Sequence, residues 1–450
     1  MVDLVLSDEA AAIARLLLDA GWQVFVVGGA VRDGLLGRVP RDIDLATDAP
    51  PDRVGAILGS GGLRPVLDDA AFGRVLVGTV DVLTLRREAE YKDRRRPSRV
   101  EFTDSVEQDL ARRDFTANAM AIDLRDGALI DPHRGTTDIE RGILRAVGPA
   151  PRRLREDALR LLRAVRLRAE LGFSYHPALA RALAMPSLGR GIGLLSAERV
   201  RDELSRLLLA PGVLQGLDDL RRFGLLPRVL PECVPMVGCP QDSPMHQWDV
   251  WEHALYATQT IAVTLPLRWA ALLHDVAKPA CRTTDETGRG HFYGHERVGE
   301  GVARDVLRRL RYGHDFVNQV AALVRHHMFH YGPETGLGAA RRLVLALGAS
   351  GVRDLLELRR ADRQASLWGY GVGPEGERLT VHLREIATER FARNDLEIDG
   401  HDVMRETGWD RGPDIGRALR AVHQRVLDGA VPNRRDALLT ALRDWLREGL

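Results

Sequence analysis

Residues 23–45 of this 450-residue chain read QVFVVGGAVRDGLLGRVPRDIDL, and the fold prediction starts from this stretch. The apolar run 23–27 is typical of a short buried strand, and it leads directly into Gly28 and Gly29. A helix is predicted to follow over residues 30–36. Glycines at such a turn let the backbone approach a phosphate, whose charge is attracted by the free N–H groups of the helix N-terminus. The stretch therefore predicts a strand–turn–helix unit that can receive a phosphate group.

Two aspartates close the same stretch, because Asp42 and Asp44 stand two residues apart on a predicted strand. Residues with that spacing project from one face, so their carboxylates repel each other unless a cation neutralises them. Asp81 lies on a later predicted strand, residues 79–85, among apolar neighbours. An isolated Asp-x-Asp pair is usually a solvated strand face. Three carboxylates on adjacent strands after a strand–turn–helix unit instead favour a two-Mg²⁺ site for phosphoryl transfer.

The remaining pattern divides the chain into a mixed α/β part and a helical part. Further strands are predicted at 75–77, 100–102 and 120–124, and helices at 8–20, 151–171, 196–209 and 216–223. Strand signals vanish from Asp138 onward. Prolines cluster over residues 227–244, which makes that segment the best candidate for a linker between domains.

The amino-acid composition limits the classes of protein to which this chain can belong. Hydrophobic residues make up 45% of the chain and charged residues 28%, and the length suggests about two to four globular domains. The net charge is +1, but residues 151–210 contain 12 arginines against 6 acidic residues, so this segment is locally basic. The basic residues of the chain are almost all arginines, which favour contact with phosphates, although a biased genome would give the same preference for arginine over lysine. The 3 cysteines form no disulfide framework, and no signal peptide or membrane span is recognised, so a cytoplasmic protein without a membrane partner is expected.

Several motifs together resemble a known family. The run VGGAVRD at 27–33, followed by the Asp-x-Asp pair, is similar to the head of class II tRNA nucleotidyltransferases in the polymerase-β superfamily. RRDFTANA at 112–119 looks like the family's ribose-recognition motif, and REDALR at 155–160 looks like its nucleotide-templating motif. Asp131-Pro132 with Gly135 looks like the hinge motif, and residues 196–208 look like the helical motif that follows.

The resemblance implies an α+β fold, in which a polymerase-β-like mixed α/β head precedes an all-α neck and body. It implies an enzyme that adds or repairs the 3′-terminal CCA of tRNA from CTP and ATP, without a nucleic-acid template and with Mg²⁺. Asp42 and Asp44 would hold the Mg²⁺ and would be catalytic together with Asp81. The implied nucleotide-binding residues are Gly29, Arg32, Arg113, Asn118, Asp157, Arg160, Arg163 and Arg166.

The templating motif also has a physical interpretation. If residues 151–171 form one helix, Asp157 and Arg160 stand three residues apart on one face. Cytosine and adenine both present an exocyclic amine beside a ring-nitrogen acceptor, which a carboxylate and a guanidinium can recognise together. Uracil and guanine present the reverse pattern, at a cost of roughly 1–3 kcal/mol per mismatched pair. A surface ion pair is the simpler alternative, and the motif context favours templating.

The polar segment 86–99 is predicted to be a mobile loop. In the family this position holds a loop needed for the last A, which CC-only enzymes have shortened, so its full length argues against a CC-only enzyme. Full CCA addition and addition of the final A alone both remain open. A bacterial poly(A) polymerase is a further alternative, because that enzyme shares the head, although AFGRV at 71–75 is only partly like its basic motif. An RNA-binding regulator with inactive sites is the alternative from outside the enzymes.

A second chemical pattern lies in the C-terminal half, where 9 of the 14 histidines fall between His246 and His330. LLHDVAKP at 272–279, GHFYGHE at 290–296 and RAD at 360–362 resemble an HD phosphohydrolase domain. The resemblance implies a divalent metal, such as Ni²⁺, Mn²⁺ or Mg²⁺, and a metal-bound water that attacks a 2′,3′-cyclic phosphate or a phosphomonoester. The implied ligands are His253, His274, Asp275 and Asp362, with His295 and His326 as members of a weaker second metal position.

These expectations divide the chain into four parts. The nucleotidyltransferase head is predicted at residues 1–145, the helical neck and body at 146–230, an all-α HD domain at 231–375, and a helical tail at 376–450. The tail is expected to contact tRNA. The oligomeric state is not predicted.

Overall fold

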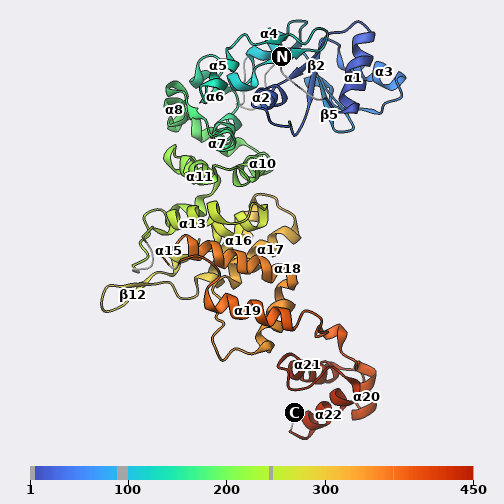
Figure 1. Ribbon diagram of the computed structural model, residues 1–450, viewed down its shortest axis with the longest axis vertical. Helices are drawn as coiled ribbons and strands as arrows, with labels where there is room; N and C mark the ends of the chain where they lie inside the picture. The colour runs from blue at the N-terminus through green and yellow to red at the C-terminus, as the bar shows by residue number, and fades with distance from the viewer. Residues whose placement is uncertain (1–5, 89–99, 243–246, 368, 449–450) are drawn as a thin grey trace. The chain divides into compact units, whose positions relative to one another are not determined.

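The computed structural model describes residues 6–88, 100–242, 247–367 and 369–448, and Figure 1 shows its helices and strands. The chain forms two compact units, Met1–Val234 and Pro235–Leu450. The division falls inside the proline-rich segment 227–244. The predicted loop at 86–99 lies mostly outside the described residues. No described helix is both long enough and apolar enough to cross a membrane.

The first unit is built on a seven-stranded sheet with the order β3-β4-β5-β2-β1-β8-β9. Its strands are β1 (Val24–Val27), β2 (Asp44–Thr47), β3 (Pro65–Asp69), β4 (Arg74–Val77), β5 (Val80–Thr84), β8 (Ala121–Asp123) and β9 (Leu129–Ile130). A separate ribbon pairs β6 (Arg86–Glu88) with β7 (Val100–Phe102). Helices α1 (Asp8–Asp19) and α3 (Pro51–Ser60) pack against each other beside the sheet (Figure 1).

The strand register explains where the chemistry gathers. Strand β1 is fully buried and pairs antiparallel with β2, so that its last residue, Val27, lies opposite Asp44. The Gly28 turn that leads into α2 (Gly29–Leu35) therefore begins beside the acidic pair. Strand β2 also pairs parallel with β5, which places Asp44 opposite Asp81.

Helices complete the first unit. They include α4 (Val106–Ala111), α5 (Gly135–Glu140), α6 (Ala150–Glu156), α7 (Leu159–Leu171), α8 (Pro177–Leu183), α10 (Ala197–Leu208) and α11 (Val213–Arg222). Helix α7 is largely buried and packs against α10 and α11. Within this unit the prediction of no strand after Asp138 is wrong for one parallel pair, β10 (Ile143–Leu144) and β11 (Ser174–Tyr175), since strands of two residues show no periodicity.

The predicted continuous helix over 151–171 is also wrong. Asp157 has extended backbone angles, φ −137° and ψ 117°, and separates α6 from α7. Its Oδ1 accepts a hydrogen bond from the N–H of Leu159 at 3.0 Å, which satisfies one of the donors at the start of α7. Asp157 and Arg160 are therefore not two members of one helix face.

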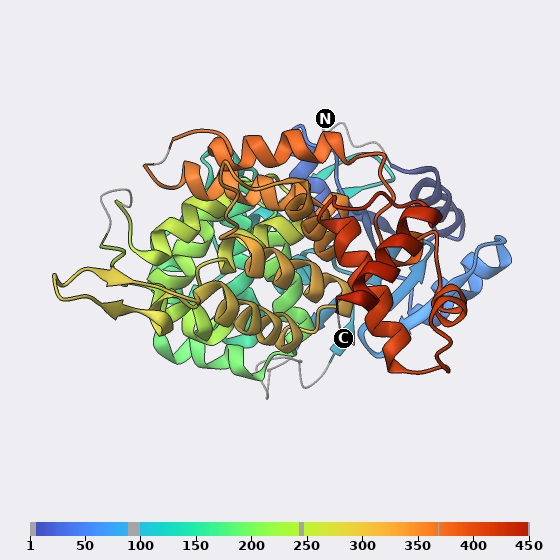
Figure 2. The same cartoon turned by 90° about the horizontal axis from the view of Figure 1, so that it is seen from below.

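The second unit is mainly helical. Its principal helices are α13 (Val250–Thr260), α14 (Leu265–Leu273), α16 (His295–Arg309), α17 (His314–His326), α18 (Leu337–Gln364), α19 (Gly373–Glu385), α20 (Gly400–Thr407), α21 (Pro413–Leu427) and α22 (Arg435–Arg447). Trp251 and Trp269 are fully buried on α13 and α14 and anchor the core there. The expected all-α architecture has one exception among the described residues, a hairpin of β12 (Thr283–Thr284) and β13 (Gly290–His291) that projects from these helices (Figures 1 and 2).

Candidate nucleotide-binding and metal sites

A cavity of about 800 Å³ opens in the first unit beside the acidic pair. Asp42 and Asp44 line it together with the eight residues predicted to bind nucleotide: Gly29, Arg32, Arg113, Asn118, Asp157, Arg160, Arg163 and Arg166. Gly29 and Arg166, the first and last of these eight residues, are 137 positions apart in the chain (29 to 166), so the fold brings distant residues together at one cavity. Sequence reasoning missed further charged lining residues, namely Asp33, Arg41, Asp69, Arg74, Arg86, Arg112, Asp114, Arg199 and Arg206.

The acidic pair has the properties of a cation site. Asp42 is exposed, whereas Asp44 is half-buried at the start of β2. Burial raises the pKa of the Asp44 carboxyl above its usual value; Arg113 opposes that rise, and the charges of Asp81 and Asp42 add to it. Carboxylate oxygens crowded in this way are the ligands that Mg²⁺ prefers, so the donor set fits the predicted metal.

Asp81 is placed differently from the pair. Its two carboxylate oxygens accept hydrogen bonds from Nε and Nη2 of Arg74, at 2.7 and 3.1 Å. Arg74 lines the cavity, and Asp81 is not among the lining residues. The structure thus shows Asp81 neutralised by a neighbouring guanidinium, and its role as a third catalytic carboxylate stays a prediction.

The glycine turn brings the backbone close to a charged side chain. Gly28 has φ 76° and ψ −128°, a conformation that residues with a Cβ rarely adopt. A Cβ atom at this position would lie 2.9 Å from Nη1 of Arg113. At Gly29 the nearest atom would be Nη2 of Arg32 at 3.5 Å, an ordinary contact. The steric requirement for glycine therefore falls on Gly28 rather than on Gly29.

Gly28→Ala is expected to reduce the activity of this cavity on the order of 10²-fold, because the strained turn would shift and displace Arg113. Steady-state kinetics of nucleotide incorporation would measure the loss. Gly127→Ala is a matched control, since Gly127 has a φ of 74° on an exposed turn with nothing within 4 Å of its added Cβ. It should lower stability slightly and leave activity intact. Equal losses in both variants would contradict a role for the close approach to Arg113.

Hydrogen bonds hold the arginines at the cavity wall. Arg32 donates from Nη1 to Oδ1 of Asn118 at 2.6 Å and from Nε to Oδ1 of Asp33 at 2.9 Å. Asn118 donates in turn to Asp114 at 3.4 Å, and Nε of Arg163 lies 3.1 Å from the other oxygen of Asp114. Burial alone would raise the pKa of Asp114, but the nearby arginines hold it below its usual value. This chain of contacts fixes two cations, Arg32 and Arg163, beside a fixed anion.

The predicted templating residues are held by separate partners. Oδ2 of Asp157 lies 2.7 Å from Nη2 of Arg199, a residue of α10. Arg160 is buried and donates from Nη1 to Glu156 and from Nη2 to the carbonyl of Arg112 at 3.0 Å. Both side chains still line the same cavity, although they do not share one helix.

Arg166 is more enclosed than the prediction of a triphosphate contact suggests. Its guanidinium lies 2.5 Å from carboxylate oxygens of both Glu170 and Glu203, and its side chain is 2% exposed. The pair with Glu203 ties α7 to α10, whereas the pair with Glu170 lies within α7. A triphosphate contact by Arg166 stays a prediction.

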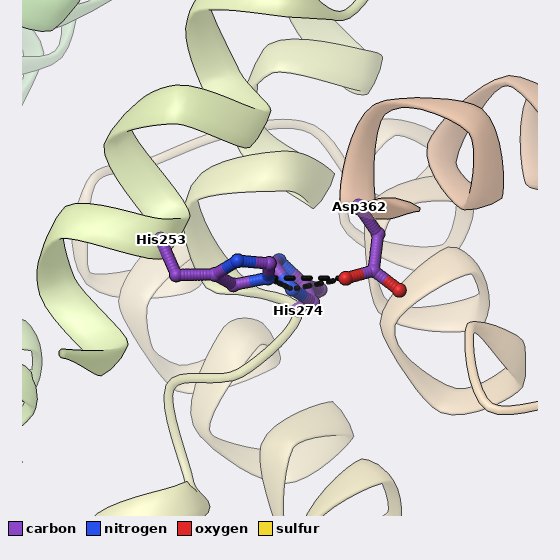
Figure 3. Close-up of side chains that lie close together, drawn as sticks. All are labelled: His253, His274 and Asp362. Atoms are coloured by element: carbon purple, nitrogen blue, oxygen red, sulfur yellow. Dashed lines mark hydrogen bonds and ion pairs between the residues drawn. The ribbon is translucent and has the colours of Figure 1, made fainter. Parts of the chain in front are cut away.

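Figure 3 shows a cluster in the second unit, called the first cluster below, which is formed by the buried His253 and His274 and the half-buried Asp362. Nε2 of His253 lies 3.2 Å from Nε2 of His274 and 3.0 Å from Oδ1 of Asp362. The three side chains come from α13, the end of α14, and α18. They are close enough together to hold one metal ion.

A second cluster adjoins the first and consists of Asp275, His295 and His327. Nε2 of His295 lies 3.2 Å from Nε2 of His327 and 3.3 Å from Oδ1 of Asp275. The prediction of His326 at this position is wrong. Helix α17 ends at His326, and it is His327, the next residue, that turns into the cluster and becomes fully buried.

Asp275 is a fully buried carboxylate at the junction of the two clusters, and its surroundings keep it ionised. Burial would raise the pKa of its carboxyl, but the charges of His274 and Lys278 hold that pKa well below its usual value. Burial lowers the pKa of the His327 imidazole. Both carboxylate oxygens of Asp275 are buried, and Nζ of Lys278 approaches Oδ2 to 2.7 Å. A buried carboxylate beside several imidazole nitrogens is a donor set that fits a bound cation.

A cavity of about 370 Å³ lies over the second cluster. Its wall includes Asp275, Lys278, Arg289, His291, Tyr293, His295, His327, Arg359, Asp362 and Arg363. The aromatic and cationic residues at 289–293 come from the projecting hairpin and the turn that follows it. Cations beside these buried histidines and carboxylates can attract an anionic group such as a phosphate.

Three family descriptions match this chain. Residues 24–145 match the Poly A polymerase head domain, residues 173–236 match the RNA and SrmB-binding site of polymerase A, and residues 297–442 match tRNA nucleotidyltransferase domain 2. None of these three descriptions names a phosphohydrolase, so the interpretation of the clusters in the second unit depends on their own side chains.

Relatives are similar over nearly the whole chain. The A-adding tRNA nucleotidyltransferase of Deinococcus radiodurans is 34% identical over 94% of this chain and 95% of its own. The CC-adding tRNA nucleotidyltransferase of Thermus thermophilus is 36% identical over 92% of both chains. The CCA-adding enzyme of Geobacillus stearothermophilus is 31% identical over 98% of this chain and 96% of its own. The crystal structure of the Bacillus stearothermophilus CCA-adding enzyme in complex with CTP matches with a TM-score of 0.74 and 28% identity, over 98% of this chain and 97% of that one.

Proposed function

Because the chain belongs to the class II CCA-adding tRNA nucleotidyltransferase family, we propose that it builds and repairs the complete CCA end of tRNA from CTP and ATP. The observation that carries the proposal is the 800 Å³ cavity. It combines an acidic pair for a metal, several arginines for a triphosphate, and an acid with a guanidinium that can recognise a base.

In the proposed reaction the 3′-hydroxyl of tRNA attacks the α-phosphate of the nucleotide, and pyrophosphate leaves. Mg²⁺ bound by Asp42 and Asp44 would lower the pKa of the hydroxyl and neutralise developing charge. Arg32 and Arg163, already oriented by Asn118 and by Asp114, would hold the triphosphate without further ordering. The turn at Gly28 leaves room for a phosphate beside the N-terminus of α2.

Base selection is proposed for Asp157 and Arg160. Each carboxylate oxygen can accept more than one hydrogen bond, so Asp157 can keep Leu159 and Arg199 and still accept from an exocyclic amine. Arg160 is anchored by Glu156 and would present its remaining N–H groups to a ring nitrogen. These partners hold both side chains in place before the nucleotide binds, so the protein itself can select the base without a nucleic-acid template.

Asp157→Ala is expected to lower the preference for CTP over UTP by about 10- to 100-fold, because a bidentate base contact is worth roughly 1–3 kcal/mol. The ratio of kcat/KM values for CTP and UTP on tRNA that lacks CCA would measure the change. Asp202→Ala is the matched control, since Asp202 lies on α10 outside the cavity, is 64% exposed and pairs with Arg201. An unaltered C-to-U preference in a folded Asp157→Ala protein would contradict the proposed role.

Addition of the final A alone is the second candidate, and a poly(A) polymerase is the third. The A-adding relative is as similar to this chain as the CCA-adding relatives are, which keeps the first of these alternatives open. Purified protein given tRNA that lacks all of CCA discriminates among them. An A-only enzyme leaves that substrate unchanged, and a poly(A) polymerase makes a long tail on unrelated RNA.

We also propose that the second unit contains an HD phosphohydrolase domain. A divalent metal, such as Ni²⁺, Mn²⁺ or Mg²⁺, would be held by the first cluster and Asp275, and would supply a water nucleophile for a 2′,3′-cyclic phosphate or a phosphomonoester. The buried carboxylate of Asp275 beside the histidines, and the cationic cavity wall, support this proposal. The head at 1–145, the neck and body at 146–230, the HD domain at 231–375 and the tail at 376–450 are the proposed domain limits.

A further inference from the structure

The acidic pair lies between two walls of the 800 Å³ cavity. Strand β2, which carries Asp44, pairs with β1 on one side and with β5 on the other. The glycine turn follows β1, and all eight residues predicted to bind nucleotide belong to α2 or to segments after α4. The segment from β3 to β6, on the β5 side of the sheet, supplies lining residues that the proposed nucleotide contacts leave unused: Asp69, Phe72, Arg74, Leu83 and Arg86.

The direction of nucleotidyl transfer gives this second wall a specific role. The attacking and leaving oxygens lie roughly in line, on opposite sides of the α-phosphate. A triphosphate held at the glycine turn and by Arg32 would have its leaving pyrophosphate on the β1 side of Asp44. The 3′-hydroxyl would then approach from the β5 side, so the last nucleotide of the RNA would lie against the second wall.

Phe72 is the only aromatic residue among the described residues that line the cavity. It stands between β3 and β4 and is half-buried, so part of its side chain is open to the cavity. The turn behind it is closely packed. Gly73 has φ 75°, and a Cβ atom there would lie 2.9 Å from Cε1 of Phe102 and 3.0 Å from Cβ of Thr84. The fold around this turn therefore fixes where the ring of Phe72 lies.

Arg86 holds the same ring from one side. Its Cζ lies over the Phe72 ring, 5.6 Å from the centroid, and its Nη1 donates a hydrogen bond to the carbonyl of Phe72. The backbone of Arg86 is anchored in turn. Its N–H donates to Oδ1 of Asp109 at 3.3 Å, and its carbonyl accepts from Nε of Arg112 at 3.2 Å. A guanidinium on one face of the ring holds the aromatic plane in place before any ligand binds.

We propose that Phe72 stacks against the base of the 3′-terminal nucleotide of the RNA, and that Arg86 holds the ring for this contact. The inference rests on the function proposed for the first unit. In that reaction the terminal base changes at each step, from the base that precedes CCA to C and again to C. Hydrogen bonds chosen for one base would fail on another, whereas an aromatic ring stacks on any base, because every base has a π-face. The competing arrangement is a Phe72 that only packs beneath Arg86 and touches no RNA.

An acceptor without a terminal base separates the two arrangements. Two tRNAs that end in CC would be compared, one natural and one with an abasic 3′-terminal nucleotide. Filter binding would give the Kd of each tRNA, and addition of A from ATP would give kcat and KM. Phe72→Ala should bind the natural acceptor about 10- to 100-fold more weakly than the wild-type protein does. It should bind the abasic acceptor as the wild-type protein does, with an unchanged KM for ATP, because the two removals delete one contact.

Three further variants serve as controls. Phe72→Trp keeps an aromatic face and should retain the preference for the natural acceptor. Phe72→Leu keeps apolar bulk without that face and should lose the preference, which provides the test if Phe72→Ala does not fold. Phe102→Ala is the matched control, since Phe102 lies behind the same turn, is 45% exposed and is not among the lining residues. It should keep the wild-type values.

A wild-type protein that binds both acceptors equally would overturn the inference, and so would equal weakening of both acceptors by the loss of the Phe72 ring. The same loss of preference in Phe102→Ala would also overturn it, because the effect would then belong to the turn. The proposed transfer fails separately. A preference for the natural acceptor that depends on Phe72, without any addition of nucleotide, removes the proposed transfer and keeps the stacking contact. Addition of A with equal binding of both acceptors does the reverse.

Discussion

Asp42→Ala is expected to abolish addition of C and A to tRNA while the hydrolysis proposed for the second unit stays unchanged. Asp42 and Asp44 line one cavity, and crowding and burial already raise the pKa of Asp44. Removal of one carboxylate would remove a metal ligand and several kcal/mol of transition-state stabilisation, a loss of about 10³-fold or more. Single-turnover incorporation of labelled CTP would measure the first activity, and release of phosphate from a cyclic or terminal phosphoester the second.

A neighbouring aspartate serves as the control for this prediction. Asp52 lies in the first turn of α3, is exposed, and is not among the residues that line the cavity. Asp52→Ala should retain full nucleotide addition. If Asp42→Ala adds C and A at the wild-type rate, the assignment of the acidic pair is wrong.

His274→Ala combined with Asp275→Ala is expected to show the opposite pattern. The double variant would remove a nitrogen donor of the first cluster and the carboxylate that both clusters share, so hydrolysis should fall to background. Nucleotide addition should persist, because the first unit folds around its own core and sheet. Circular dichroism would verify that the second unit retains its helices.

The chain contains a natural control for that double variant. His314 and Asp315 form the same dipeptide in the same unit, but their side chains are 80% and 107% exposed. His314→Ala with Asp315→Ala should leave both activities unchanged. Hydrolysis that survives the loss of His274 and Asp275 would show that another site is responsible.

Local patterns were enough to predict the acidic pair and the glycine turn. A buried strand, two glycines and a short helix follow one another without interruption, and the register of β1 on β2 then places Gly28 near Asp44. The eight residues expected to bind nucleotide were predicted from motif resemblance, and the structure gathers them at one cavity. Their individual roles stay predictions.

Long-range contacts account for what the sequence could not predict. The helical pattern of 151–171 does not reveal the break at Asp157, whose partner Arg199 lies 42 residues away. Likewise, the pairing of Arg74 with Asp81 depends on the alignment of β4 with β5. The choice between His326 and His327 depends on where α17 ends, and end positions of helices are poorly determined by periodicity.

Product length on a tRNA that lacks its CCA end tests the central claim, that one protein cavity selects C and A in place of a nucleic-acid template. Purified protein would be incubated with that tRNA and with CTP, ATP, UTP and GTP, singly and together, and the products would be sequenced. The account predicts addition of C with CTP alone, completion to CCA when ATP is also present, and no incorporation of U or G. Failure to add any C, or equal use of all four nucleotides, would contradict it.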